Sequence, residues 1–152
     1  MRVPQSISRA HPFMHHTFKK YHDLPAAIAI GLYLLGAHFY IVQTIFMTDT
    51  WLAARDIGNE AAPIVRIMGA TYLGFAVGLI LTFINGPDGQ RTFFNALLVA
   101  QVLTLVILWQ THFMGSLPVS AAALDTLLQD AIAVSVLTAL LLFGCFKLRS
   151  RL

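Results

Sequence analysis

Residues 121–146 read AAALDTLLQDAIAVSVLTALLLFGCF, and this stretch decides the fold class. It exceeds the roughly 20 mostly apolar residues that a helix needs to cross a bilayer. Its apolar side chains do not alternate with polar ones, as they would along a strand of a membrane β-barrel. The stretch therefore predicts a transmembrane α-helix, and Ser120 stands where its side chain can cap the first turn.

Three further segments have the same apolar character. They are 25–47 (PAAIAIGLYLLGAHFYIVQTIFM), 61–84 (AAPIVRIMGATYLGFAVGLILTFI) and 93–114 (FFNALLVAQVLTLVILWQTHFM). Pro25 and Pro63 fall in predicted first turns, where the missing N–H of proline costs nothing. The fold expected from the sequence is therefore an all-α, integral membrane four-helix bundle that occupies residues 25–146.

The composition excludes several classes of protein. Of the 152 residues, 57% are hydrophobic and 11% are charged, whereas an average soluble domain has roughly 25% charged residues. This argues against a soluble enzyme, a disordered protein and a nucleic-acid-binding protein, despite a formal net charge of +3. The single cysteine, Cys145, excludes an internal disulfide, a Cys-based zinc site and a dithiol redox pair.

The positions of the basic residues predict the orientation in the membrane. One side of the predicted helices has Arg2, Arg9, Lys19, Lys20, Arg91, Lys147, Arg149 and Arg151. The opposite side has only Arg55, in the first loop. The positive-inside rule therefore places both termini in the cytoplasm. Residues 1–24 become a basic, His-rich arm, either an interfacial helix or a disordered segment, and residues 147–152 become a basic cytoplasmic tail.

Polar side chains inside the helices are the candidates for function, because ionisable groups are costly in a bilayer. Counting about 1.5 Å per residue from the cytoplasmic helix ends places four of them at depths of about 24–28 Å. They are Gln43, Arg66, His112 and Asp130, one from each helix. Either each is simply interfacial, with Arg66 reaching to the headgroups, or they form a polar cluster at the outer mouth of the bundle, with Arg66 paired to Asp130.

Small residues spaced by four predict where helices pack closely. The second helix has Ala70, Gly74 and Gly78 at this spacing, and the first has Ala27 and Gly31. Both sets are interpreted as helix-packing surfaces. The spacing does not say whether the neighbour of the second helix is another helix of this chain or another protein.

The histidines offer weaker hypotheses. His38 is interpreted as a hydrogen-bonded residue in a helix interface, with haem or pigment ligation as the alternative. A bis-histidine haem needs two histidines at similar depth, whereas His112 lies about 8 Å higher than His38. His11, His15 and His22 share a helix face, but no carboxylate or thiol completes a metal shell. We therefore expect no metal site, and the sequence identifies no cofactor.

Arg66 is followed closely by Gly69, and Gly74 and Gly78 continue the same helix. In this the chain resembles the DoxX-like group of small bacterial four-helix membrane proteins, whose second helix often starts with an arginine followed by glycines. The resemblance implies a compact bundle in the bacterial inner membrane, in some members as a membrane subunit of a quinone-linked oxidoreductase. The resemblance implies no particular activity, and the chain has no cysteine pair.

Three functions remain open at this point. The leading hypothesis is a non-catalytic accessory or assembly subunit of a larger inner-membrane complex, such as an electron-transfer complex, with the lipid bilayer and either other membrane proteins or copies of itself as partners. The second is a small membrane enzyme or binding protein for a quinone or lipid-like ligand, with Gln43, Arg66, His112 and Asp130 around its pocket. The third is a haem or pigment carrier.

Overall fold

The computed structural model describes residues 21, 23–114 and 120–152, and every regular element within them is helical. The four long helices are α2 (Leu24–Phe46), α4 (Ala62–Asn85), α5 (Arg91–Met114) and α6 (Ala121–Leu148). Each begins and ends within two residues of a segment expected from the sequence. All four are long and apolar enough to cross a membrane, which indicates a multi-pass membrane protein.

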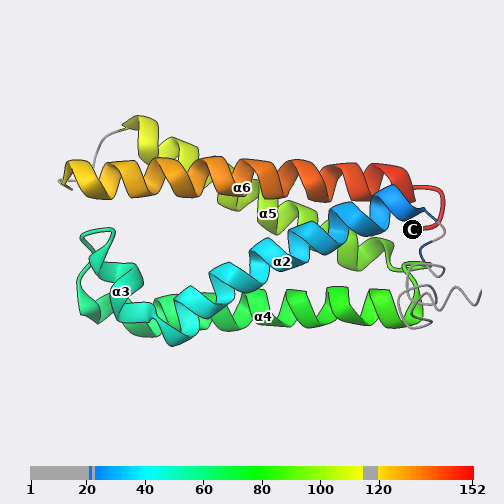
Figure 1. The fold of residues 1–152 in the computed structure, drawn as a ribbon, viewed down its shortest axis with the longest axis horizontal. Coiled ribbons are helices and arrows are strands. Elements are labelled where there is room, and N and C mark those ends of the chain that lie inside the picture. The colour runs from blue at the N-terminus through cyan, green and yellow to red at the C-terminus, as the bar shows by residue number, and fades with distance from the viewer. Residues whose placement is uncertain (1–20, 22, 115–119) are drawn as a thin grey trace, which may run out of the picture.

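The loop after α2 contains structure that the sequence did not predict. A short helix α3 (Thr48–Ala53) and a 3-10 turn η1 (Asn59–Ala61) fold at the end of the bundle opposite the C-terminus (Figure 1). Leu52 of α3 is fully buried, so this segment packs onto the bundle. The segment from Thr48 to Ala61 is called the α3–η1 segment below.

Helix α2 crosses the bundle obliquely. At the end where the C-terminus lies it runs beside α6, and at the α3 end it runs beside α4 (Figure 1). Helix α5 packs mainly against α6, and the backbones of α4 and α5 approach each other less closely. As a result, α2 and α6 diverge toward the α3 end and leave space between them.

Two capping side chains and a glycine mark the helix ends, and the cap predicted at Ser120 is confirmed. The Ser120 side chain caps α6 by accepting a hydrogen bond from the Ala123 N–H at 3.2 Å. The Asp23 carboxylate caps α2 in the same way. Helix α4 stops at Gly86, whose φ of 99° lies in the region that favours glycine.

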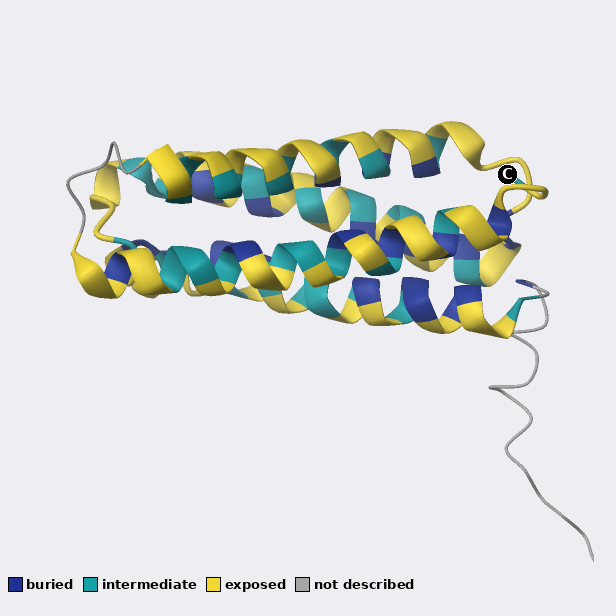
Figure 2. Ribbon diagram, turned by 90° about the horizontal axis from the view of Figure 1, so that it is seen from above, coloured by how far each residue is buried: buried dark blue, intermediate teal, exposed yellow. Residues whose placement is uncertain are grey.

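The best-packed part of the core lies toward the end that holds the C-terminus. Ile30, Leu79, Phe94 and Leu141 from the four long helices are almost fully buried there. Tyr21 is buried beside them. On the outside, large apolar side chains such as those of Leu35, Phe39, Phe46 and Ile64 are exposed, and Figure 2 shows exposed residues along the outward sides of the helices. An apolar exterior of this extent fits contact with lipid.

The small residues of α4 do not pack as one surface. Ala70 and Gly74 are exposed, and no atom lies within 4 Å of a Cβ placed on Gly74. Only Gly78 meets another helix, because a Cβ at that position would lie 2.5 Å from the Phe93 ring of α5. Within the described residues, Ala70 and Gly74 therefore meet no helix of this chain, and a packing surface toward another protein stays a prediction.

The close approach of α4 and α2 occurs at Gly69 instead. A Cβ at Gly69 would lie 2.5 Å from Thr44 Oγ1 and 2.7 Å from Ile45 Cγ1. On α2, Ala27 is fully buried and Gly31 faces α4 at ordinary contact distance, as a packing surface requires.

We expect Gly69→Ala to lower the free energy of unfolding by about 1–3 kcal/mol, because the added methyl overpacks the contact with α2. Gly74→Ala is the matched control. It should be neutral or stabilising by up to about 1 kcal/mol, because alanine favours the helix and meets no neighbour. Unfolding of the purified variants in detergent micelles measures both. Equal effects would contradict the assignment of Gly69 as the contact glycine.

Candidate functional site

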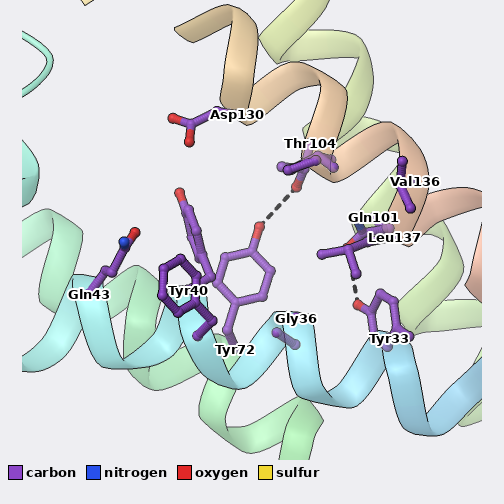
Figure 3. A pocket seen from close by; sticks show the side chains of 14 residues that line it. Tyr33, Gly36, Tyr40, Gln43, Tyr72, Gln101, Thr104, Asp130, Val136 and Leu137 are labelled. Carbon is purple, nitrogen blue, oxygen red and sulfur yellow. Dashed lines mark hydrogen bonds between the residues drawn. The ribbon is translucent and has the colours of Figure 1, made fainter. Parts of the chain in front are cut away.

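Two adjoining cavities lie between the long helices, from the middle of the bundle toward its α3 end. The central cavity has a volume of about 390 Å³ and is bordered by side chains from all four long helices (Figure 3). The loop cavity, of about 600 Å³, lies beside the α3–η1 segment and is bordered by Trp51, Arg55 and Ile57 among others. Both volumes fall in the range of about 300–1,000 Å³ typical of small-molecule sites.

Four residues border both cavities, and we call them the shared wall. They are Tyr40, Tyr72, Thr104 and Asp130, one from each long helix.

Polar contacts between helices frame the central cavity. The Tyr72 hydroxyl lies 3.0 Å from Thr104 Oγ1 and links α4 to α5. Tyr33 donates to Gln101 Oε1 at 3.0 Å, and Gln101 Nε2 donates to Thr138 Oγ1 at 3.3 Å, so α2, α5 and α6 are joined as well. These buried and half-buried groups satisfy one another, as burial requires, and link the helices around the space.

Asp130 forms an ion pair with Arg55 at the α3 end of the site. Asp130 Oδ2 accepts hydrogen bonds from Arg55 Nη2 at 2.6 Å and from Arg55 Nε at 2.9 Å. The side chains are only 11% and 21% exposed, for Arg55 and Asp130 respectively. The guanidinium carbon lies 4.0 Å from the centre of the Trp51 ring, and Nη1 donates to the Trp51 carbonyl. Both partners are therefore held in one geometry.

The predicted pair between Arg66 and Asp130 was wrong. Arg66 is exposed, and its Nε donates to Thr48 Oγ1 at 3.3 Å on the α3–η1 segment. The sequence predicts Arg55 in the first loop, and the folding of α3 brings it to Asp130. Of the four residues proposed as a cluster, Gln43 and Asp130 border the central cavity, whereas Arg66 and His112 border neither cavity.

Neither histidine within the described helices faces the cavities. His38 Nδ1 lies 3.0 Å from the Leu34 carbonyl of its own helix, and the His112 ring lies edge-on to the Trp109 ring. His38 and His112 therefore border neither the central nor the loop cavity, and haem or pigment ligation stays a prediction. The described residues contain no group of three His, Cys, Asp or Glu side chains that could hold a metal ion. The other histidines considered as ligands lie outside the described residues: His11, His15 and His22.

Three polar groups at the central cavity have no hydrogen-bond partner among the residues that the structure describes. They are the Tyr40 hydroxyl, the Gln43 side-chain amide and Asp130 Oδ1, the second oxygen of the ion-paired carboxylate. Figure 3 shows Tyr40 and Gln43 extending from α2 toward Asp130 on α6. These three groups are not fully buried; among the described residues, the fully buried side-chain atoms without a partner are Trp51 Nε1 and His112 Nδ1. The three groups border the cavity, where a bound molecule can supply their partners.

The spacing of four residues along α2 is a sequence signal for this site. Tyr33, Gly36, Tyr40 and Gln43 follow one another at intervals of three, four and three residues, which places them on one face of a helix. A tyrosine adds apolar area to such a face, but its hydroxyl needs a partner when it is buried. A helix face with two tyrosines and a glutamine predicts a polar lining.

A second contact fastens the α3–η1 segment to α6. Asp56 Oδ2 accepts a hydrogen bond from the Ser120 N–H at 2.8 Å. Hydrogen bonds from Ser120 hold the pKa of Asp56 below its ordinary value of 3.8. Arg55 and Asp56 are consecutive in the chain, so one short stretch binds α6 at both Asp130 and Ser120 and borders the loop cavity.

No protein-family model, no curated protein and no solved structure matches the chain. The resemblance to DoxX-like proteins therefore stays a prediction. The molecule itself presents an apolar space among four helices with a few convergent polar groups on its walls, which is the usual form of a ligand-binding site.

Arg55→Met should lower the free energy of unfolding by about 2 kcal/mol, between the values for exposed and fully buried ion pairs. The loss arises because the Asp130 carboxylate loses both of its hydrogen bonds from Arg55. Arg55→Met combined with Asp130→Leu should recover part of the loss, as a double-mutant cycle would show. Arg66→Met is the control and should cost well under 1 kcal/mol. An Arg66 variant as unstable as the Arg55 variant would contradict the observed pairing.

Proposed function

We propose that this protein binds a lipid-soluble small molecule, with the central cavity as the binding site. The observation that carries the proposal is the set of three unpartnered polar groups, on Tyr40, Gln43 and Asp130, in an otherwise largely apolar space. Apolar walls bind the body of such a molecule through burial, and a few polar groups fix its orientation.

The route of entry is lateral. Phe39 and Val136 border the central cavity, yet they are 68% and 55% exposed on the outer surface. They lie on α2 and α6, the two helices that diverge toward the α3 end (Figure 1). In a membrane this side of the bundle faces lipid, so a lipid-soluble molecule reaches the cavity without crossing water.

The orientation follows from the basic residues. The end of the bundle with Lys147, Arg149 and Arg151 also receives the start of α5 at Arg91. By the positive-inside rule this end faces the cytoplasm, and the α3–η1 segment with the loop cavity faces outward. The resemblance to DoxX-like proteins supports the bacterial inner membrane as the location.

The test fills the central cavity with a larger side chain and identifies which bound molecules the protein then no longer retains. Ala133 borders the central cavity, and we expect Ala133→Trp to occupy it. The wild-type protein and the variant are extracted in native membrane discs, and the bound organic molecules are compared by mass spectrometry. A molecule enriched with the wild type should fall at least tenfold with Ala133→Trp.

Ala139→Trp is the matched control, because Ala139 is exposed on the same helix and does not border the cavity. It should retain the molecule. Loss of the enriched molecule from both variants, or no enrichment with the wild type, would contradict a binding site in the central cavity.

A second candidate function is an accessory or assembly subunit of a larger membrane complex. The observation that favours it is the exposed strip around Ala70 and Gly74 of α4, where no part of the described chain covers the small residues. Small residues four apart on a lipid-facing helix allow the helix of another protein to approach closely.

For the accessory function, Gly74→Phe should release a copurifying membrane partner, because the ring prevents close approach of a second helix. Ile80→Phe, on another exposed face of α4, should retain the partner. Affinity purification in mild detergent with protein mass spectrometry measures both. A wild-type protein that purifies alone as a monodisperse 16.7 kDa species would argue against this function.

A further inference from the structure

We propose that the molecule bound in the central cavity has a neutral hydroxyl head group, as in a long-chain alcohol or a phenol. This inference rests on the proposed function and assigns the head group to Tyr40, Gln43 and Asp130. Two observations support this assignment. The three side chains retain free hydrogen-bonding capacity, and Arg55 already balances the charge of Asp130.

The charge at the site is balanced before any ligand binds. Arg55 directs two N–H groups to Asp130 Oδ2, with a shortest distance of 2.6 Å, and this leaves Oδ1 as an acceptor. An anionic head group would lie against this carboxylate oxygen and be repelled by it. A cationic head group would compete with Arg55, which its own contacts with Trp51 hold in place. A neutral head group avoids both costs.

The remaining hydrogen-bonding capacity matches a hydroxyl. Asp130 Oδ1 can only accept, the Tyr40 hydroxyl can donate, and the Gln43 amide can do either. A hydroxyl can donate to Asp130 while it accepts from Tyr40 or Gln43. An ether or a ketone of the same size only accepts, so it would leave Asp130 Oδ1 unpaired.

The other polar residues at the cavity are already occupied. Tyr72 is bonded to Thr104, and Tyr33 to Gln101. They form part of the walls and offer the head group no unpaired hydroxyl. Recognition of the head group therefore falls to the three unpartnered groups near the α3 end of the cavity.

The rest of the cavity receives the apolar part of the molecule. Gly36, Ala37 and Leu137 border it, and Phe39 and Val136 stand at its lateral opening. With its head group at Asp130, a chain can therefore extend between α2 and α6 toward the lipid.

The experiment compares three photoreactive probes in nanodiscs of phosphatidylcholine, a lipid without a hydroxyl group. The probes are 1-hexadecanol, its methyl ether and hexadecanoic acid, each with a diazirine in the middle of the chain. Labelling of the full-length protein is followed by intact mass against the mole fraction of probe, and peptide mass spectrometry locates the labels. We expect the alcohol to half-saturate at a mole fraction about tenfold lower than the ether or the acid, with labels on cavity-lining residues of α2 and α6.

Variants assign the head-group contacts. Tyr40→Phe should weaken the binding of the alcohol and of the ether alike, by about three- to tenfold, because both probes accept a hydrogen bond from the Tyr40 hydroxyl. The double variant Arg55→Met/Asp130→Leu removes the acceptor and its cation together and should abolish the preference for alcohol over ether. Tyr21→Phe is the matched control: its hydroxyl is bonded to Thr82 away from the cavities, so binding should not change.

The outcomes separate the two proposals. If the alcohol and the ether label the cavity equally well, or if the acid binds most tightly, the head-group assignment fails and the central cavity remains a lipid-binding site. If no probe gives saturable labelling of the cavity, the proposed function fails and the head-group assignment fails with it.

Discussion

The ion pair between Arg55 and Asp130 is the interaction on which the α3 half of the molecule depends. It joins the α3–η1 segment to the third turn of α6, and it is the one ion pair that either residue makes within the described part of the chain. The contact between Asp56 and Ser120 reinforces it. Arg55, Asp56 and Asp130 border the loop cavity, and Asp130 also borders the central cavity, where its Oδ1 has no partner. A structural ion pair thus also prepares a polar group for binding.

The position of the central cavity follows from where α2 approaches its neighbours. Near the C-terminal end of the chain, Gly144 of α6 lets Ile30 pack at close distance, and toward the α3 end, Gly69 of α4 admits Thr44. A helix held against α6 at one end and against α4 at the other must cross the bundle obliquely. This crossing separates α2 from α6 toward the α3 end. Side chains fill the space between them only in part, and the remainder is the central cavity. These two glycines therefore mark close contacts of α2 with α6 and with α4.

Much of the fold was predictable from the sequence, whereas most of the site was not. Long apolar runs bounded by Pro25, Pro63 and Ser120 set the helices within two residues, because length and hydropathy suffice to define such helices. Depth along the helices brought Gln43 and Asp130 to a common level, and both border the cavity. Depth does not say which way a side chain points around a helix axis. For that reason Arg66 was paired with Asp130 in error.

The sequence by itself determined the number, length and apolar character of the long helices, since these depend on local composition. Only the tertiary structure decided which polar groups meet. Arg55 reaches Asp130 because α3 folds back over the bundle, and Tyr40 and Gln43 face the same carboxylate because α2 is tilted and rotated by its glycine contacts. Helix rotation and loop path arise from packing between distant segments, which no local pattern of residues records.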